Sequence, residues 1–214
     1  MMHIYPPQVD RTGRPLRRGV VVGIAGPIAA GKSTVSLFLA GLGAREIDAD
    51  AICHHFLRSP EIVAKIVDIF GPEVLDANGQ PDRWKIGRLA FDCQERISRL
   101  NDLLHPLLVE EIEREIQEAR REGVMLVINA ALLFETGISD YCDYIITVTA
   151  DKAVREARAI SKRGWPEGEM ERREAFLLSL EHKIANSHFV IHNNGNYEEL
   201  QKEVVRVYKE IVNG

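Results

Sequence analysis

The sequence has few cysteines, and they are not arranged to build a disulfide framework or a zinc site. Among its 214 residues are three cysteines, Cys53, Cys93 and Cys142, which lie far apart with no pair at CxxC spacing. Secreted disulfide scaffolds and thiolate zinc sites both need a denser or closer grouping of cysteines. We therefore expect all three to be small residues of the interior.

Long hydrophobic runs and an excess of positive charge are also missing. No stretch approaches the ~18–20 apolar residues that span a bilayer, and no apolar signal-peptide core follows the N-terminal charges. The 27 Lys and Arg residues are outnumbered by 32 Asp and Glu, so a net charge of −5 gives the whole chain no attraction for nucleic acid or anionic membrane. The expectation is a cytoplasmic monomer or weak homo-oligomer without nucleic-acid or membrane partners.

What is present is typical of one folded domain. Hydrophobic residues make up 45% of the chain and charged residues 28%, which is ordinary for a globular protein. Residues 1–18 contain three prolines and several arginines without a periodic apolar pattern, which favours a flexible N-terminal arm. Residues 19–214 are predicted to form a single folded domain.

Five short apolar runs rich in Val and Ile indicate strands, with helical periods between them. They are residues 20–26, 44–48, 125–134, 144–150 and 189–193. This alternation is typical of βαβ units, so the predicted fold is α/β, a parallel sheet of about five strands flanked by helices. Apolar residues at helical spacing predict an amphipathic helix over 107–122 and another at the C-terminus. The roughly 75 residues between the second and third runs exceed a minimal crossover, which predicts an inserted helical lobe over 55–122.

A phosphate-binding loop follows the first run. Gly26-Pro-Ile-Ala-Ala-Gly31-Lys32-Ser33-Thr34 matches GxxxxGK[ST] between a predicted strand and helix. Its glycines let backbone N–H groups approach phosphates, and the helix N-terminus adds a positive dipole end. The predicted ATP-binding residues are Gly26, Ala29, Ala30, Gly31, Lys32, Ser33 and Thr34, with Lys32 on the β- and γ-phosphates and the Ser33 hydroxyl on Mg²⁺.

Two carboxylates follow the second run. Asp48 and Asp50 stand where a parallel strand ends, and that edge of an open sheet faces the ligand crevice. They are suited to holding Mg²⁺ or to accepting a proton from an acceptor hydroxyl. The alternative, a helix N-cap followed by a solvated acid, stays open on position alone.

Several segments together resemble the dephospho-CoA kinase family. They are GIAGPIAAGKSTV, IDADAI, FGPEVLDANGQPDR, LNDLLHPLL, ALLFETG and HNNG, in that order, and the resemblance covers residues 20–210. It implies a P-loop kinase with an inserted acceptor-binding lobe and a basic lid. The implied reaction moves the γ-phosphoryl of ATP to the ribose 3′-hydroxyl of dephospho-CoA.

The resemblance also implies roles for single residues. Asp50 would be the general base, with Asp48 beside it near the metal and the acceptor. Arg83 matches an arginine of the acceptor-binding lobe, and His105, with Pro106, matches the pair at that lobe's return to the sheet. Asn193 of the HNNG segment would belong to the ATP site.

A basic segment is expected to form the lid, over residues 152–187. Residues 152–163 hold five basic residues against one acid, and cations are what a transferring phosphoryl group requires. Arg155, Arg158 and Arg163 are the candidates. Arg158 aligns best with the family's lid arginine and is the predicted catalytic cation.

The sequence departs from the family pattern at three places. Ala131 replaces a proline before LLFE, Leu177 replaces a glutamine after the lid arginine represented by Arg173, and Ser187-His188 replaces Ala-Asp, while Lys183 and Asn193 are kept. A divergent kinase for another small-molecule or nucleotide hydroxyl, and a non-catalytic ATP-binding sensor, therefore stay open as alternatives. Trp84 and Trp165 are suited either to stacking on an adenine or to packing within the protein.

Overall fold

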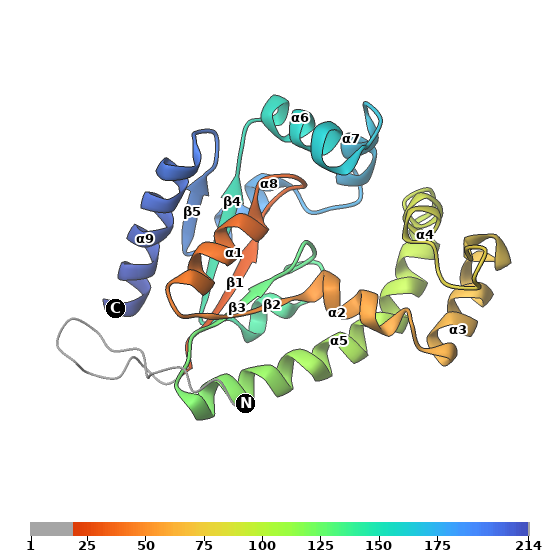
Figure 1. Cartoon of the computed structure of the whole chain (residues 1–214), viewed down its shortest axis with the longest axis horizontal. Helices are drawn as coiled ribbons and strands as arrows, with labels where there is room; N and C mark the ends of the chain where they lie inside the picture. Colours follow the sequence, from red (N-terminus) through yellow and green to blue (C-terminus); the bar gives the residue numbers. More distant parts are fainter. Residues whose placement is uncertain (1–18, 214) are drawn as a thin grey trace.

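The computed structural model describes residues 19–213 and is built on one parallel sheet (Figure 1). The strands are β1 (Val21–Ala25), β2 (Arg45–Asp48), β3 (Leu126–Asn129), β4 (Tyr144–Thr149) and β5 (Phe189–His192), in the order β2-β3-β1-β4-β5. All pairings are parallel, which confirms the predicted α/β class. The predicted arm, residues 1–18, lies outside the described residues.

The third apolar run is a strand only in its first part. β3 ends at Asn129, so the predicted strand over 125–134 is wrong beyond that residue. The Ala130 N–H still donates to the Ile24 carbonyl at 3.4 Å, after which the chain turns, with the Thr136 N–H on the Leu132 carbonyl. Leu133 is 1% exposed although it lies in this turn, which explains why the run reads as continuously apolar.

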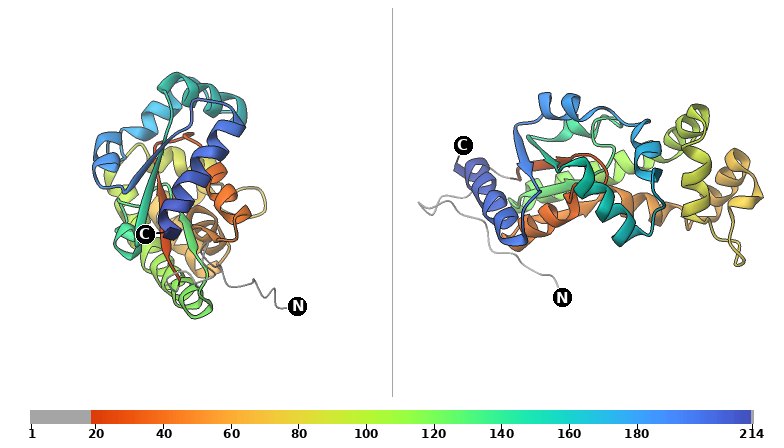
Figure 2. Two further views of the ribbon diagram at one scale, coloured as in Figure 1. Left: turned by 90° about the vertical axis from the view of Figure 1, so that its left-hand side faces the viewer. Right: turned by 90° about the horizontal axis from the view of Figure 1, so that it is seen from above.

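Helices cover both faces of the sheet (Figure 2). On one face, α1 (Lys32–Gly41) and α9 (Tyr197–Asn213) pack on inward residues of β1, β3, β4 and β5. On the other, α2 (Ala49–Phe56) and the C-terminal half of α5 (Gln94–Glu122) pack on Val21, Leu126, Ile128 and Ile145. This division follows the alternation of side chains along each strand. Cys53 and Cys142 lie at the edge of the second cluster, and all three cysteines are free and half-buried.

The inserted lobe has a core of its own. It contains α3 (Pro60–Phe70), the short 3-10 helix η1 (Pro72–Val74), α4 (Arg83–Ala90) and the first part of α5. Its apolar cluster runs from Leu57 to Leu107. Because Leu108–Ala119 packs on the sheet instead, we propose that the lobe proper ends near Leu107 and not at residue 122.

One long helix joins the lobe to the sheet. The predicted helix start at residue 107 is wrong, because α5 runs continuously from Gln94 to Glu122 with Pro106 inside it. Proline lacks the N–H of the regular helical bond, so the sequence suggested a boundary there. Packing on two clusters, one in the lobe and one under the sheet, holds the helix through the proline.

Three helices follow β4 in the predicted lid. They are α6 (Lys152–Arg163), α7 (Glu169–Glu174) and α8 (Leu180–Ala185), and a further 3-10 helix, η2 (Ile138–Tyr141), precedes β4. Figure 1 shows α6 and α7 above the carboxyl ends of the strands, with α4 to their right. Among residues 19–213, no helix is long and apolar enough to cross a membrane.

Candidate active site

The phosphate-binding loop has the backbone shape that its glycines allow. Gly31 has φ 102°, and a Cβ there would lie 2.1 Å from the Asn193 amide nitrogen. Gly26 has φ 142°, and a Cβ there would meet the Val148 carbonyl at 2.1 Å. Both positions therefore exclude side chains. Ala29 also adopts a positive φ, of 58°, which turns the loop toward the start of α1 at Lys32.

Lys32 points back into its own loop. Its Nζ donates to the carbonyls of Gly26 at 3.0 Å and Pro27 at 3.2 Å. Burial lowers the pKa of Lys32 to about 8, and the Asp50 carboxylate opposes this shift. A cation held at a loop of N–H groups without a full countercharge is poised for an anionic ligand.

An asparagine that the sequence analysis missed joins the loop to the second strand. The Asn129 amide nitrogen lies 3.2 Å from the Ser33 hydroxyl oxygen and donates to the Asp48 carboxylate at 3.3 Å. Asn129 is 5% exposed and ends β3, between the ends of β1 and β2. Its position at a strand end beside the loop was the available signal. The arrangement gathers a hydroxyl and a carboxylate in one place.

The two aspartates lie in different positions at the start of α2. Asp48 caps α2 by accepting from the Ala51 N–H at 3.0 Å, while Asp50 stands in the first turn of that helix. The pKa of Asp50 is raised, first by burial of the carboxyl and then by the negative charge of Asp48. Lys32, Arg163 and Arg83 act in the opposite direction on that pKa. Three predicted site residues and one lid arginine thus act on one carboxyl.

Asn193 and Arg158 close the other side of the loop. The Asn193 amide donates to the Ala30 carbonyl at 2.7 Å, and Arg158 donates to the Asn193 carbonyl at 2.9 Å. Arg158 also reaches the Ala30 carbonyl at 3.5 Å. These contacts bring together residues predicted from distant segments.

The comparisons with known proteins agree with this geometry. The sequence model of the family described as dephospho-CoA kinase matches residues 20–199. The chain belongs to the dephospho-CoA kinase family. Dephospho-CoA kinases from Fusobacterium nucleatum and Aquifex aeolicus are 35% and 36% identical, over 87% and 89% of this chain and 96% of each relative. The crystal structure of TT1252 from Thermus thermophilus has a TM-score of 0.74 at 27% identity, covering 90% of this chain and 98% of that one.

A second residue that the sequence analysis did not predict ties the helices after β4 to the phosphate loop. Glu174 on α7 accepts from the Ile28 N–H at 3.0 Å and pairs with Arg155 at 2.5 Å. Arg155 is 7% exposed and also donates to the carbonyls of Ala150 and Ile28. Of the three lid arginines considered from the sequence, Arg155 is therefore committed to holding the loop and the lid together.

The predicted acceptor-side residues lie in two places. Arg83 begins α4, and its charge acts on Asp50 and on His54, whose pKa is lowered mainly by burial. His105 lies elsewhere, with its Nε2 2.5 Å from the Thr136 carbonyl oxygen, so it fastens α5 to the turn after β3. Among residues 19–213, the hydrogen bond of His105 lies at this turn and not at the phosphate loop.

Two of the residues that depart from the family pattern, Ser187 and His188, contact β4. His188 Nδ1 accepts from the Ile145 N–H at 3.0 Å, and the Ser187 hydroxyl lies 2.6 Å from that of Thr147. Both contacts support the pairing of β4 with β5 in the sheet. Lys183, which the family pattern keeps, is 1% exposed and lies 2.9 Å from Glu135 at the end of the turn after β3.

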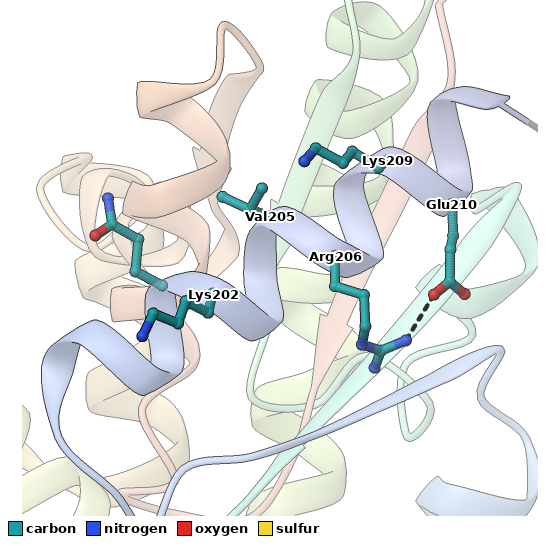
Figure 3. Close-up of a pocket in the computed structure, with 6 residues that line it drawn as sticks. Lys202, Val205, Arg206, Lys209 and Glu210 are labelled. Carbon is teal, nitrogen blue, oxygen red and sulfur yellow. Dashed lines mark hydrogen bonds and ion pairs between the residues drawn. The ribbon is translucent and has the colours of Figure 1, made fainter.

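Two negative findings bound the site. Within the described residues, no group of three or more His, Cys, Asp and Glu side chains could hold a metal by itself. A surface hollow on the outer face of α9 contains no residue of the phosphate loop (Figure 3). Its lining comes from one helix, Gln201, Lys202, Val205, Arg206, Lys209 and Glu210. This hollow therefore lies apart from the phosphate loop.

Proposed function

We propose that this chain transfers the γ-phosphoryl group of ATP to the ribose 3′-hydroxyl of dephospho-CoA, giving coenzyme A and ADP. The observation that carries the proposal is the meeting of Lys32, Ser33 and Asp50 at the carboxyl ends of β1 and β2. Phosphoryl transfer requires a cation that binds the phosphates, a hydroxyl that binds the metal and a base, and these three residues supply them in that order. Membership of the dephospho-CoA kinase family supplies the acceptor.

The bond changes follow from these groups. The ribose oxygen attacks the γ-phosphorus and its proton passes to the Asp50 carboxylate, while the bond from phosphorus to the β–γ bridging oxygen breaks and ADP leaves. Burial and the charge of Asp48 raise the pKa of Asp50. A raised pKa makes the carboxylate a better proton acceptor than an ordinary aspartate.

Positive charge around the moving phosphoryl group comes from the loop and the lid. Lys32 would leave the carbonyls of Gly26 and Pro27 for the β- and γ-phosphate oxygens. Arg163 lies where its charge acts on both Lys32 and Asp50, so it supplies a second cation from the lid. Arg158, the arginine chosen from the sequence, holds Asn193 against the loop and serves the ATP site from there.

The residues present fit Mg²⁺. The Ser33 hydroxyl and the Asp48 carboxylate are both within bonding distance of the Asn129 amide, and an oxygen pair of this kind suits a magnesium that keeps waters and phosphate ligands. When bound, Mg²⁺ neutralises charge on the β- and γ-phosphates. Asn129 holds the two oxygen ligands in register.

The acceptor would lie between the lobe and Asp50. Arg83 at the start of α4 presents a cation toward Asp50, and dephospho-CoA carries a pyrophosphate that a guanidinium binds in a forked geometry. His105 would act through the turn after β3 and not by touching the substrate.

The experiment is ADP release by the purified protein with MgATP, with and without dephospho-CoA, followed by mass spectrometry of the product. The expected result is ADP that depends on dephospho-CoA, with product heavier by one phosphoryl group. ATP binding without any such dependence would contradict the acceptor, and a panel of nucleosides and small alcohols would then identify the true one.

A further inference from the structure

Arg173 lies where the lid meets the acceptor-binding lobe. Arg173 of α7 has its guanidinium 5.5 Å from the Trp84 ring, 5.2 Å from Phe91 and 4.3 Å from Trp165. Trp84 and Phe91 belong to the lobe, whereas Trp165 lies between α6 and α7. In Figure 1, α7 is the lid helix on the side of α4.

Arg173 is not a free surface cation. Its side chain is 13% exposed, and its Nε donates to the Glu169 carboxylate at 2.6 Å. A desolvated guanidinium on aromatic faces gains more from cation–π attraction than an exposed one. Each tryptophan that the sequence left open for adenine stacking is therefore engaged with Arg173 instead.

Other contacts bridge the same two parts. Arg172 pairs with Asp92 of the lobe at 2.5 Å, and its guanidinium reaches the Arg88 carbonyl at 3.5 Å. The rings of Phe91 and Phe176 meet edge to face at 5.9 Å between centroids. We call this set of contacts between the lobe and α7 the joint. It combines an ion pair, aromatic contacts and a hydrogen bond to the backbone.

The joint continues toward the reacting groups. The Trp165 ring contacts a second arginine: the guanidinium of Arg163 lies 5.0 Å from the ring that Arg173 also contacts. Burial lowers the pKa of Arg163, and the Asp50 carboxylate opposes that shift. A row of side chains thus runs from the lobe through Arg173 and Trp165 to a lid cation that acts on Asp50.

We propose that Arg173 is a positioning residue that ties the acceptor-binding lobe to the lid and, through Trp165, holds Arg163 over the reacting groups. The consequence for catalysis rests on the proposed function. Binding of the acceptor to the lobe then fixes the position of Arg163. Acceptor affinity and turnover therefore depend on Arg173, whereas ATP affinity does not. Arg173 itself touches no reacting atom.

The test compares Arg173→Met with Arg206→Met. Arg206 pairs with Glu203 and Glu210 on its own helix, which makes it a matched arginine far from the joint. Glu169 keeps Arg172 in the Arg173 variant, so no carboxylate is left unpaired. For Arg173→Met we expect kcat/KM for dephospho-CoA to fall about tenfold, from a higher KM and a lower kcat, with the ATP dissociation constant unchanged.

A second readout needs no substrate. The chain has two tryptophans, and both contact Arg173, so acrylamide quenching of their emission reports the joint directly. Quenching should rise in Arg173→Met and stay at the wild-type level in Arg206→Met. Quenching and kinetics equal in the two variants would overturn the proposal. If Arg173→Met does not fold, Arg173→Lys keeps the charge beside Glu169, and the same losses are expected at smaller size.

The two proposals fail in different ways. A wild-type protein that phosphorylates no dephospho-CoA, together with raised quenching in Arg173→Met, removes the proposed acceptor and keeps the tie between lid and lobe. An active wild-type protein with unchanged quenching and kinetics in the variant removes the tie and keeps the reaction.

Discussion

Asn129 and Asp48 are register partners at the ends of β3 and β2, and the amide of Asn129 donates to the Asp48 carboxylate over 3.3 Å. The same amide lies 3.2 Å from the Ser33 hydroxyl. One buried side chain thus sets the spacing between the two oxygens to which we assign Mg²⁺. Outer partners of this kind orient metal ligands and are part of the metal site.

Substituting Asn129 should therefore change the magnesium requirement. In Asn129→Ala we expect the Mg²⁺ concentration for half-maximal activity to rise by about tenfold or more, the scale found for outer partners of metal ligands. The measurement is activity against Mg²⁺ at fixed ATP. Asn194→Ala is the matched control, because Asn194 also donates to an aspartate, Asp151, but is exposed. An unchanged requirement in Asn129→Ala would contradict the assignment.

Removing the base should separate turnover from binding. We expect Asp50→Asn to lower kcat by about 10²–10⁴, the usual contribution of a general base. At a pH well below 8, where Lys32 is charged in both proteins, the ATP dissociation constant should stay near that of the wild type, because Asp50 is assigned to the acceptor hydroxyl and not to the phosphates of ATP. Asp68→Asn, at an exposed position on α3, controls for the substitution itself. A kcat near normal in Asp50→Asn would remove the base from the mechanism.

The glycine at the start of α1 offers a test of the loop geometry. Gly31→Ala forces a Cβ to within 2.1 Å of the Asn193 amide at φ 102°, so ATP binding should be lost and the free energy of unfolding should fall. Gly41→Ala, on the same helix, meets nothing within 4 Å and should stabilise the helix by about 0.5–1 kcal/mol. Thermal unfolding and ATP titration of both variants check the contrast. Equal behaviour of the two would show that the loop tolerates a side chain.

Local sequence patterns predicted most of the fold and the centre of the candidate site. The Val- and Ile-rich runs located five strands, and GxxxxGK[ST] located Lys32 and Ser33, because each depends on residues close in sequence. The length of α5 was missed because packing on two clusters overrides the local effect of Pro106. The hydrophobic period and the helix propensities of a segment do not report such packing on distant parts of the chain.

Contacts across long separations account for the rest of the site. Asn129 and Glu174 act on the loop over 96 and 146 residues, so no local pattern marks them. The choice of Arg158 as lid cation depended on alignment, whereas the structure distributes the three arginines among different partners. Arg155 holds Glu174, Arg158 holds Asn193, and Arg163 is the one whose charge acts on Asp50.

The shifted lysine predicts a pH dependence of ATP binding. Burial lowers the pKa of Lys32 to about 8 in the free protein, and phosphate binding favours its charged form. Affinity should thus be full below the free-protein pKa and decline as pH rises through about 8, because binding must then take up a proton. Isothermal titration at constant ionic strength across this range measures the decline. In Lys32→Arg the curve should be flat, since a guanidinium stays charged, although at lower affinity.

Asp50→Asn supplies the internal check on that titration. The Asp50 carboxylate raises the pKa of Lys32 against the effect of burial, so its removal should lower that pKa further. The decline in ATP affinity should then begin at a lower pH than in the wild type. A decline at the same pH in both proteins would mean that the two side chains do not interact. A decline that persists in Lys32→Arg would assign it to a group other than Lys32.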